Sequence, residues 1–364
     1  LLRADFTANK ALAAEAEPLL AEQPALRREL LRLKAQAMEK TGSPAEAFAA
    51  YLALRDQGGE SDDNMAELSR DHSARQEQWI SARLMALFTR AAPQDKNLLD
   101  QQVEARLSKA KEASGTSALS SFVDSFRFHP RAMAGQIELA RRYVAGGKLL
   151  EAEMAIGELA NHPEPTVAGP ANAVLAANYE AAERFELARE RYDILARKYS
   201  AVLCLDGKTG KDLADAASQR QDIQPLIASR EWPSGNVESK VTDLQGAGVG
   251  FSNFRYPVTL SDYRGAAPRG QRGQISTGET AFRALDSSGK LISTTSLARP
   301  GQQFLSTNHA SGKVAGHLML ISYGGELLAI DALKVRPGIT SDGLLWRADF
   351  TDGDATLRRQ NVYV

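Results

Sequence analysis

One pattern of apolar and small residues occurs twice in the middle of the chain, and it constrains the fold more than any other feature. The two copies, 36 positions apart, are Leu139, Ala140, Tyr143, Leu149, Ala152, Ile156 and Leu159, and Leu175, Ala176, Tyr179, Phe185, Ala188, Tyr192 and Leu195. A fixed period of this length is typical of a helical hairpin that buries its apolar face only by stacking on a neighbour. Such an array indicates a binding surface rather than a reactive centre.

A weaker third copy lies near the start of the chain. It consists of Ala35, Ala47, Tyr51 and Leu54. Apolar residues at every third or fourth position predict an amphipathic helix over 24–40. Thr41-Gly42 ends this helix, and Ser43-Pro44-Ala45-Glu46 predicts the capped start of the next one. Further helices are expected near 65–91, 94–113 and 116–127.

The character of the sequence changes after about residue 231. Helix-forming residues dominate before this point, whereas Gly, Ser, Thr and β-type runs become frequent after it. The predicted strands cover 256–260, 280–285, 291–295, 317–322 and 327–330. The sequence therefore predicts an α+β chain with three parts: a helical repeat domain over 1–230, a linker with first strands over 231–279, and antiparallel sheets over 280–364.

The repeated pattern resembles the tetratricopeptide repeat (TPR). The family places a small residue in its first helix, a Tyr three positions later, an Ala in its second helix and a larger residue four positions after that Ala. The first copy matches this pattern with Ala140, Tyr143, Ala152 and Ile156, and the second copy with Ala176, Tyr179, Ala188 and Tyr192. Gln136 and Asn172 stand where the family often has Trp, and the period is 36 rather than 34. The resemblance covers 131–200 and implies an α-solenoid of stacked hairpins.

The resemblance also implies that proteins or peptides bind in a groove on the concave face. The positions expected to face it are Ala134, Ile137, Arg141, Val144, Ala173, Ala177 and Glu180. We expect Ile137, Arg141, Val144, Ala177 and Glu180 to contact a partner. These residues do not form the Lys/Asn clamp by which some family members hold a carboxylate. The alternative is that this face packs against the β half of the same chain.

The β half resembles the repeat of pyrroloquinoline quinone (PQQ)-type β-propellers. One copy includes 318–322, 326–331 and Gly343-Leu344-Leu345-Trp346, and a degenerate copy covers 284–292. The degenerate copy has Ser288 in place of Thr and lacks the Trp, and the other copy is interrupted at 333–342. The resemblance implies an Asp that caps the turn, a Gly with positive φ, and a Trp that docks between blades.

Length limits the predicted propeller. A blade takes about 40–45 residues and a ring about four to eight blades, so residues 232–364 supply at most about three. We therefore expect a partial propeller and interpret the chain, which begins at Leu1 rather than Met, as a fragment of a longer protein.

Composition and motifs argue against several kinds of chemistry. The net charge of −1 creates no general field for nucleic acid, and the Arg/Gly-rich stretch 264–273 is interpreted as a solvated loop. Gly207-Lys208-Thr209 is not a P-loop, because Val202 stands where the motif needs Gly. The histidines lack metal-ligand spacing, and Cys204 lies in an apolar run. No apolar run approaches the length of about 20 residues that spans a membrane.

These observations favour a non-catalytic protein–protein interaction or scaffold protein. We expect a protein or peptide partner, and no catalytic residue, cofactor or metal in this segment. The propeller resemblance implies a bacterial protein of the cell envelope or periplasm. One alternative is a PQQ-dependent dehydrogenase whose active site, with its Ca²⁺ ligands and catalytic Asp, lies outside this segment. Another is a sensor or docking arm for a different output domain.

Overall fold

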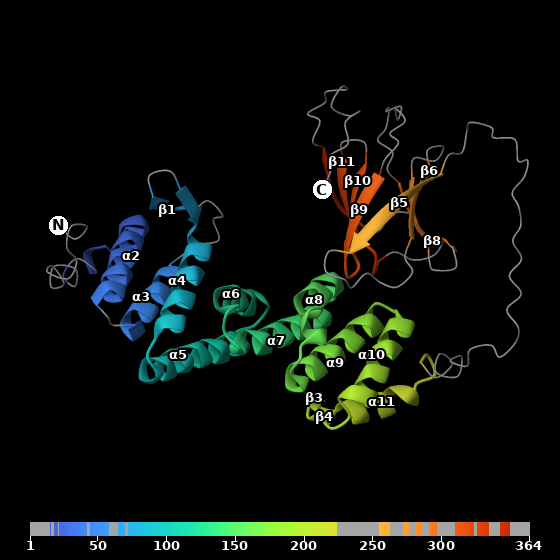
Figure 1. Cartoon of the computed structure of the whole chain (residues 1–364), viewed down its shortest axis with the longest axis horizontal. Helices are drawn as coiled ribbons and strands as arrows, with labels where there is room; N and C mark the ends of the chain where they lie inside the picture. The colour runs from blue at the N-terminus through green and yellow to red at the C-terminus, as the bar shows by residue number, and fades with distance from the viewer. Residues whose placement is uncertain are drawn as a thin grey trace, which may run out of the picture. The chain divides into compact units, whose positions relative to one another are not determined.

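The fold is α+β, with most helices before the main sheet (Figure 1). The computed structural model describes residues 15, 18–20, 22–41, 44–57, 65–69, 72–223, 255–262, 272–276, 281–285, 291–296, 310–323, 326–334 and 343–349. The backbone divides into two compact units, Leu1–Leu139 and Ala140–Val364. The predicted domain boundary at residue 230 lies outside the described residues.

The first unit is built from helices. They are α2 (Pro24–Thr41), α3 (Pro44–Asp56), α4 (Gln76–Arg90), α5 (Pro93–Glu112), α6 (Ser117–Phe126) and α7 (Arg131–Ala145), the last of which continues into the second unit. The helices predicted over 24–40, 94–113 and 116–127 are confirmed. Phe48, Leu84 and Leu99 are fully buried, so the apolar stripes of α3, α4 and α5 form the core of this unit.

A short hairpin replaces the start of one predicted helix. Strands β1 (Met65–Ser69) and β2 (His72–Arg75) pair antiparallel before α4 begins at Gln76. The prediction of a helix over 65–91 is therefore wrong for 65–75. This stretch has no β-branched residue, so the composition that normally indicates a strand is missing.

The second unit begins with the two predicted hairpin segments. After α7 come α8 (Leu149–Ile156), a 3₁₀ turn η1 (Leu159–Asn161), α9 (Pro165–Ala181) and α10 (Phe185–Lys198). The chain then forms a small hairpin of β3 (Leu203–Leu205) and β4 (Lys208–Thr209), followed by α11 (Gly210–Ser218). Helices α9 and α10 pack side by side (Figure 1), and both α11 and β3 contact this pair.

The small residues of the repeat are core residues. Ala140, Ala152, Ala176 and Ala188 all have 0% exposed surface. In the weaker N-terminal copy, Ala35 and Ala47 are also completely buried, and Tyr51 and Leu54 are buried beside them. An alanine at such a position lets neighbouring helix backbones approach closely, and larger residues fill the remaining space.

The reversals after α7 and α9 are equivalent. The N–H of Lys148 donates to the Tyr143 carbonyl over 2.8 Å, and 36 residues later the N–H of Arg184 donates to the Tyr179 carbonyl over 2.7 Å. A hydrogen bond that closes a six-residue turn at the end of a helix needs one residue in the left-handed region of backbone angles. Gly147 (φ 71°) takes this position in the first turn and Glu183 (φ 57°) in the second. The 36-residue period thus extends to the backbone of the turns.

Among the described residues, the strands that follow α11 form one eight-stranded sheet. They are β5 (Arg255–Asp262), β6 (Arg272–Ser276), β7 (Ala281–Leu285), β8 (Leu291–Ser296), β9 (Ala310–Ala315), β10 (Leu318–Tyr323), β11 (Glu326–Asp331) and β12 (Leu344–Asp349). The order is β12-β11-β10-β9-β5-β6-β7-β8. Strands β5–β8 and β9–β12 are two antiparallel meanders. The five predicted strands are confirmed as β5, β7, β8, β10 and β11, whereas β6, β9 and β12 were not predicted.

The two meanders meet through a parallel pair. Thr259 to Asp262 of β5 lie opposite Ser311 to Val314 of β9. The prediction of purely antiparallel sheets is therefore wrong at this one pair. Local patterns predict a hairpin from its turn, but they do not indicate that the first strands of two successive meanders lie side by side.

Candidate functional site

The most unusual group in the second unit is a buried carboxylate on α8. Glu153 follows the ladder residue Ala152 and is only 5% exposed. The position 36 residues later holds Arg189, so the glutamate belongs to one copy of the repeat and not to the common pattern. A buried charge requires well-placed partners, because its hydration is lost.

Three donors surround the Glu153 carboxylate. The Tyr179 hydroxyl on α9 donates to Oε1 over 2.7 Å. The backbone N–H of His317 donates to Oε2 over 3.0 Å, and its Nδ1 lies 2.8 Å from Oε1. Since an ionised carboxylate only accepts, Nδ1 carries the proton in this contact. The Tyr179 and His317 rings meet edge to face with centroids 5.7 Å apart.

The turn between β9 and β10 is shaped to reach this carboxylate. Gly316 has φ 58°, in the left-handed region. A Cβ at this position would lie 2.9 Å from Cδ of Glu153. Glycine is therefore required both by the backbone angle and by the close approach of the carboxylate.

The electrostatics favour an ionised glutamate beside a neutral tyrosine. Burial alone raises the pKa of Glu153, but the hydrogen bonds and charge of His317, together with the Tyr179 hydroxyl, outweigh it and hold the pKa below its usual range. Burial and the neighbouring Glu153 charge both raise the pKa of the Tyr179 phenol. The phenol therefore stays protonated and serves as a donor.

Further contacts join the same helices to the end of β11. The Arg184 guanidinium donates to the carbonyls of Ala332 and Leu333, both over 3.0 Å. The N–H of Ala332 donates to the His317 carbonyl over 2.8 Å, which ties this segment to the turn on Glu153. Asp331 accepts from the Leu333 N–H over 3.0 Å, and burial raises its pKa.

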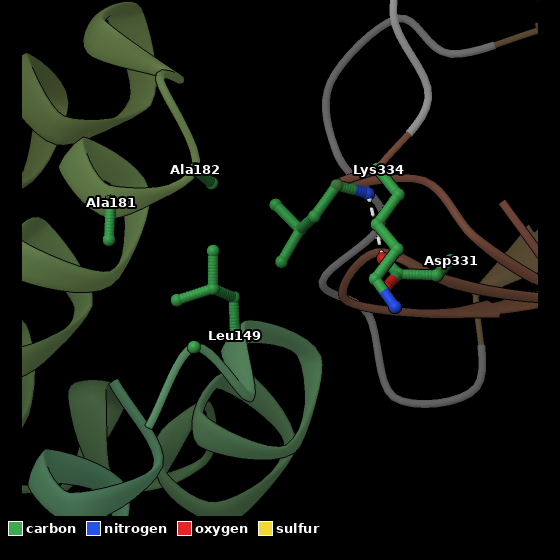
Figure 2. A pocket seen from close by; sticks show the side chains of 7 residues that line it. Leu149, Ala181, Ala182, Asp331 and Lys334 are labelled. Carbon is green, nitrogen blue, oxygen red and sulfur yellow. Dashed lines mark hydrogen bonds and ion pairs between the residues drawn. The ribbon is translucent and has the colours of Figure 1, made fainter. Parts of the chain in front are cut away.

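A pocket of about 240 Å³ lies beside these contacts. Its lining consists of Gly147, Leu149, Ala181, Ala182, Asp331, Leu333 and Lys334. Figure 2 shows Leu149, Ala181 and Ala182 on the helical side, opposite Asp331 and Lys334 from the sheet side. The helical wall is apolar, and the polar groups lie on the other wall.

The cluster holds segments together and shows no arrangement for attacking a substrate. The side chains of Glu153 and His317 are 6% and 5% exposed, and both Glu153 oxygens are occupied. A general base must come within hydrogen-bond reach of the proton it removes, and this carboxylate is enclosed. In the part of the chain that the structure describes, no three His, Cys, Asp or Glu side chains form a group that would hold a metal.

The predicted groove residues on α7 differ in exposure. Ile137 and Val144 are half-buried, whereas Arg141 is exposed. The Arg141 guanidinium pairs with Asp206 over 2.6 Å. Arg141 therefore contacts the turn of the β3–β4 hairpin, in which Asp206 and Gly207 both have left-handed backbone angles.

The predicted groove residues on α9 face contacts within the chain. Ala173 is buried in a cluster with Leu195 and Cys204. Ala177 is half-buried. Half-buried Glu180 accepts from the Tyr192 hydroxyl over 2.8 Å and pairs with Arg220 over 2.5 Å. The groove assignment stays a prediction, since these contacts do not exclude a partner at Arg141 or Val144.

The interpretation of Cys204 as a core residue is confirmed. Cys204 is a buried core residue, and burial raises its pKa to about 11, so the thiol is unreactive at neutral pH. Thr209 caps α11: its hydroxyl accepts from the Asp212 N–H, and the Asp212 carboxylate accepts from the Thr209 N–H.

Among the described helices, none combines the length and apolar character needed to cross a membrane.

A repeated glutamate–tyrosine pair was not predicted. The Tyr51 hydroxyl donates to Glu39 over 3.0 Å, as Tyr192 does to Glu180. Both pairs are 12 positions apart and link the two helices of a hairpin. Arginines complete both clusters, with Arg83 on Glu39 and Arg220 on Glu180. The shared spacing is visible in the sequence. By contrast, 164 positions separate Glu153 from His317, and no sequence pattern indicates their contact.

Comparisons with protein-family models, curated proteins and solved structures found no significant match.

Proposed function

We propose that this chain is a non-catalytic protein–protein interaction or scaffold protein of the bacterial cell envelope, in which TPR-like hairpins support part of a PQQ-like β-propeller. The observation that carries the proposal is the complete burial of the ladder alanines Ala140, Ala152, Ala176 and Ala188. Burial at these positions is what stacked helical hairpins require, and stacked hairpins commonly present extended binding surfaces.

The organisation of the sheet supports the propeller part of the proposal. Each meander has four antiparallel strands, as a propeller blade has. The meanders meet at β5 and β9, the first strand of each, and these run parallel. Neighbouring blades arranged around a common axis also have parallel first strands. Trp346 on β12 is 45% exposed, as expected of a tryptophan that docks against a further blade.

The contacts of the titratable groups support a non-catalytic role. Glu39, Glu153 and Glu180 each bind a tyrosine hydroxyl and a basic or imidazole side chain. These contacts join helices to one another or to the sheet. The three carboxylates therefore stabilise the packing of these elements.

Affinity capture tests the proposal directly. Wild-type chain, Arg141→Ala and the exposed α8 control Glu151→Ala would be incubated with a bacterial cell-envelope extract, and bound proteins would be quantified. We expect one or a few proteins bound by wild type and Glu151→Ala but depleted with Arg141→Ala. Equal capture by all three forms would contradict a role for the predicted groove.

A second assay separates this proposal from the dehydrogenase alternative. PQQ and Ca²⁺ would be added to the chain and to the longest available form of the protein, and dye reduction with alcohol or sugar substrates would be measured. The proposal predicts no reduction above that of the cofactor alone. Reduction that depends on the protein would favour the enzyme.

A further inference from the structure

The helices and the sheet of the second unit meet through a polar joint. On one side of it, Glu153 accepts two N–H groups of His317. On the other, Arg184 donates to two backbone carbonyls after β11, those of Ala332 and Leu333. The pocket beside the joint leaves the facing walls incompletely filled. Contacts between domains that are polar and loosely packed permit relative motion.

The helical side does not depend on the sheet for its core. Ala173, Leu195 and Cys204 form a buried cluster with Tyr192, Tyr199, Val202, Leu205 and Leu213 packed against it. All these residues lie between 173 and 213, before the sheet begins. The hairpin α9–α10 and its β3–β4 cover therefore have an apolar core of their own, and separating the sheet would leave this core intact.

The buried carboxylate gives the joint two favourable states and an unfavourable path between them. When the turn is docked, His317 satisfies two of the three hydrogen bonds of Glu153. When it is fully separated, water replaces those donors. In a partly separated state the Glu153 carboxylate has lost its His317 donors but is not yet hydrated, and this state therefore has a high free energy. Such a joint opens and closes as a unit rather than gradually.

We propose that the β9–β10 turn is a detachable latch: Gly316-His317 docks on Glu153, and its release frees the sheet from the helical hairpins while both remain folded. Gly316 makes the docking possible because any Cβ there meets the carboxylate. Tyr179 donates to Glu153 from the helical side. This contact involves no residue of the turn, so release of the turn would leave the binding site for it organised. The latch therefore fixes the orientation of the sheet on the helical array.

Distance measurements between spin labels test the latch. Cysteines replacing exposed Lys198 on α10 and Leu345 on β12 would be labelled in a Cys204→Ala chain, and the distribution of distances would be measured by pulsed electron paramagnetic resonance. We expect one narrow peak. In either orientation of its amide, Glu153→Gln places the N–H₂ group against a His317 N–H, because His317 donates to both oxygens of the carboxylate. The substitution should therefore largely abolish this peak and produce a broad distribution. The control Glu151→Gln changes the same charge on exposed α8 surface and should keep the narrow peak.

A second variant acts from the sheet side. Gly316→Ala leaves every helical residue unchanged but blocks docking, and it should also broaden the distribution. Far-UV circular dichroism should show wild-type helix content in both variants. The latch is overturned if the parent chain already gives a broad distribution, if both variants keep the narrow peak, or if both lose their helical signal. The last result would mean that the joint is part of the folded core.

Discussion

The left-handed residue in each hairpin turn offers a sharp test of the repeat. Gly147 has φ 71°, and a Cβ added to it would have no atom within 4 Å. Gly147→Ala therefore strains the backbone without causing a steric clash. A Cβ at Gly146, whose φ lies outside the left-handed region, has the Arg142 carbonyl oxygen at 3.3 Å as its nearest neighbour. Both substitutions reduce the entropy of the unfolded chain equally. The left-handed penalty, about 1–2 kcal/mol, applies only to Gly147→Ala. Gly146→Ala instead carries the cost of its close contact with the Arg142 carbonyl oxygen, so the difference between the two variants is at most this penalty.

Hydrogen exchange measures this difference locally. A change of about 1–2 kcal/mol alters an opening equilibrium roughly 5- to 30-fold. The Lys148 amide, which donates to the Tyr143 carbonyl, should exchange faster by up to this factor in Gly147→Ala than in Gly146→Ala. The equivalent Arg184 amide, 36 residues later, should be unaffected by either change. Equal exchange at Lys148 in the two variants would refute the assigned turn geometry.

The remaining predictions concern the helix packing and the buried acid. Ala188→Leu inserts a larger side chain at a completely buried position and should cost about 1–3 kcal/mol of unfolding free energy. Exposed Ala196→Leu on the same helix should change it by less than about 0.5 kcal/mol; urea unfolding followed by circular dichroism compares the two. Tyr192→Phe removes a hydroxyl that donates to Glu180 and should cost about 1.5–3 kcal/mol in the same assay; wild-type stability would contradict the contact. The lowered pKa of Glu153 means that its contribution is complete above its usual pKa and is lost as the pH falls through the folded value. The narrow spin-label distance should therefore persist from neutral pH to about pH 4.5 and broaden in stronger acid, and persistence there would exclude an ionised Glu153 from the joint.

The helical hairpins were predictable because their determinants are local and periodic. Proline and glycine positions located the helix ends, and the 36-residue spacing alone placed Ala140 and Ala176 in the core, where both are completely buried. The same reasoning predicted five of the strands after residue 231, since β-branched runs and turn residues are also local signals. It failed at 65–75, where these signals are missing.

The candidate site was not predictable from local patterns. Glu153 breaks the repeat at a position where the other copy has Arg189, but a lone glutamate in a helix indicates a solvated surface more often than a core charge. Glu153 can be recognised as a structural charge only from its contact with His317. The fold of the second unit brings these two distant residues together. The parallel pairing of β5 with β9 was missed for the same reason.

Site-specific photocrosslinking shows most directly whether the helical array binds a protein partner through the predicted groove. A photoreactive amino acid would replace exposed Arg141 on α7 or, as a control, exposed Met154 on α8, and both chains would be irradiated in a cell-envelope extract. We expect a discrete protein adduct from position 141 that is absent or much weaker from position 154. Adducts of equal yield from both positions, or none from either, would contradict it.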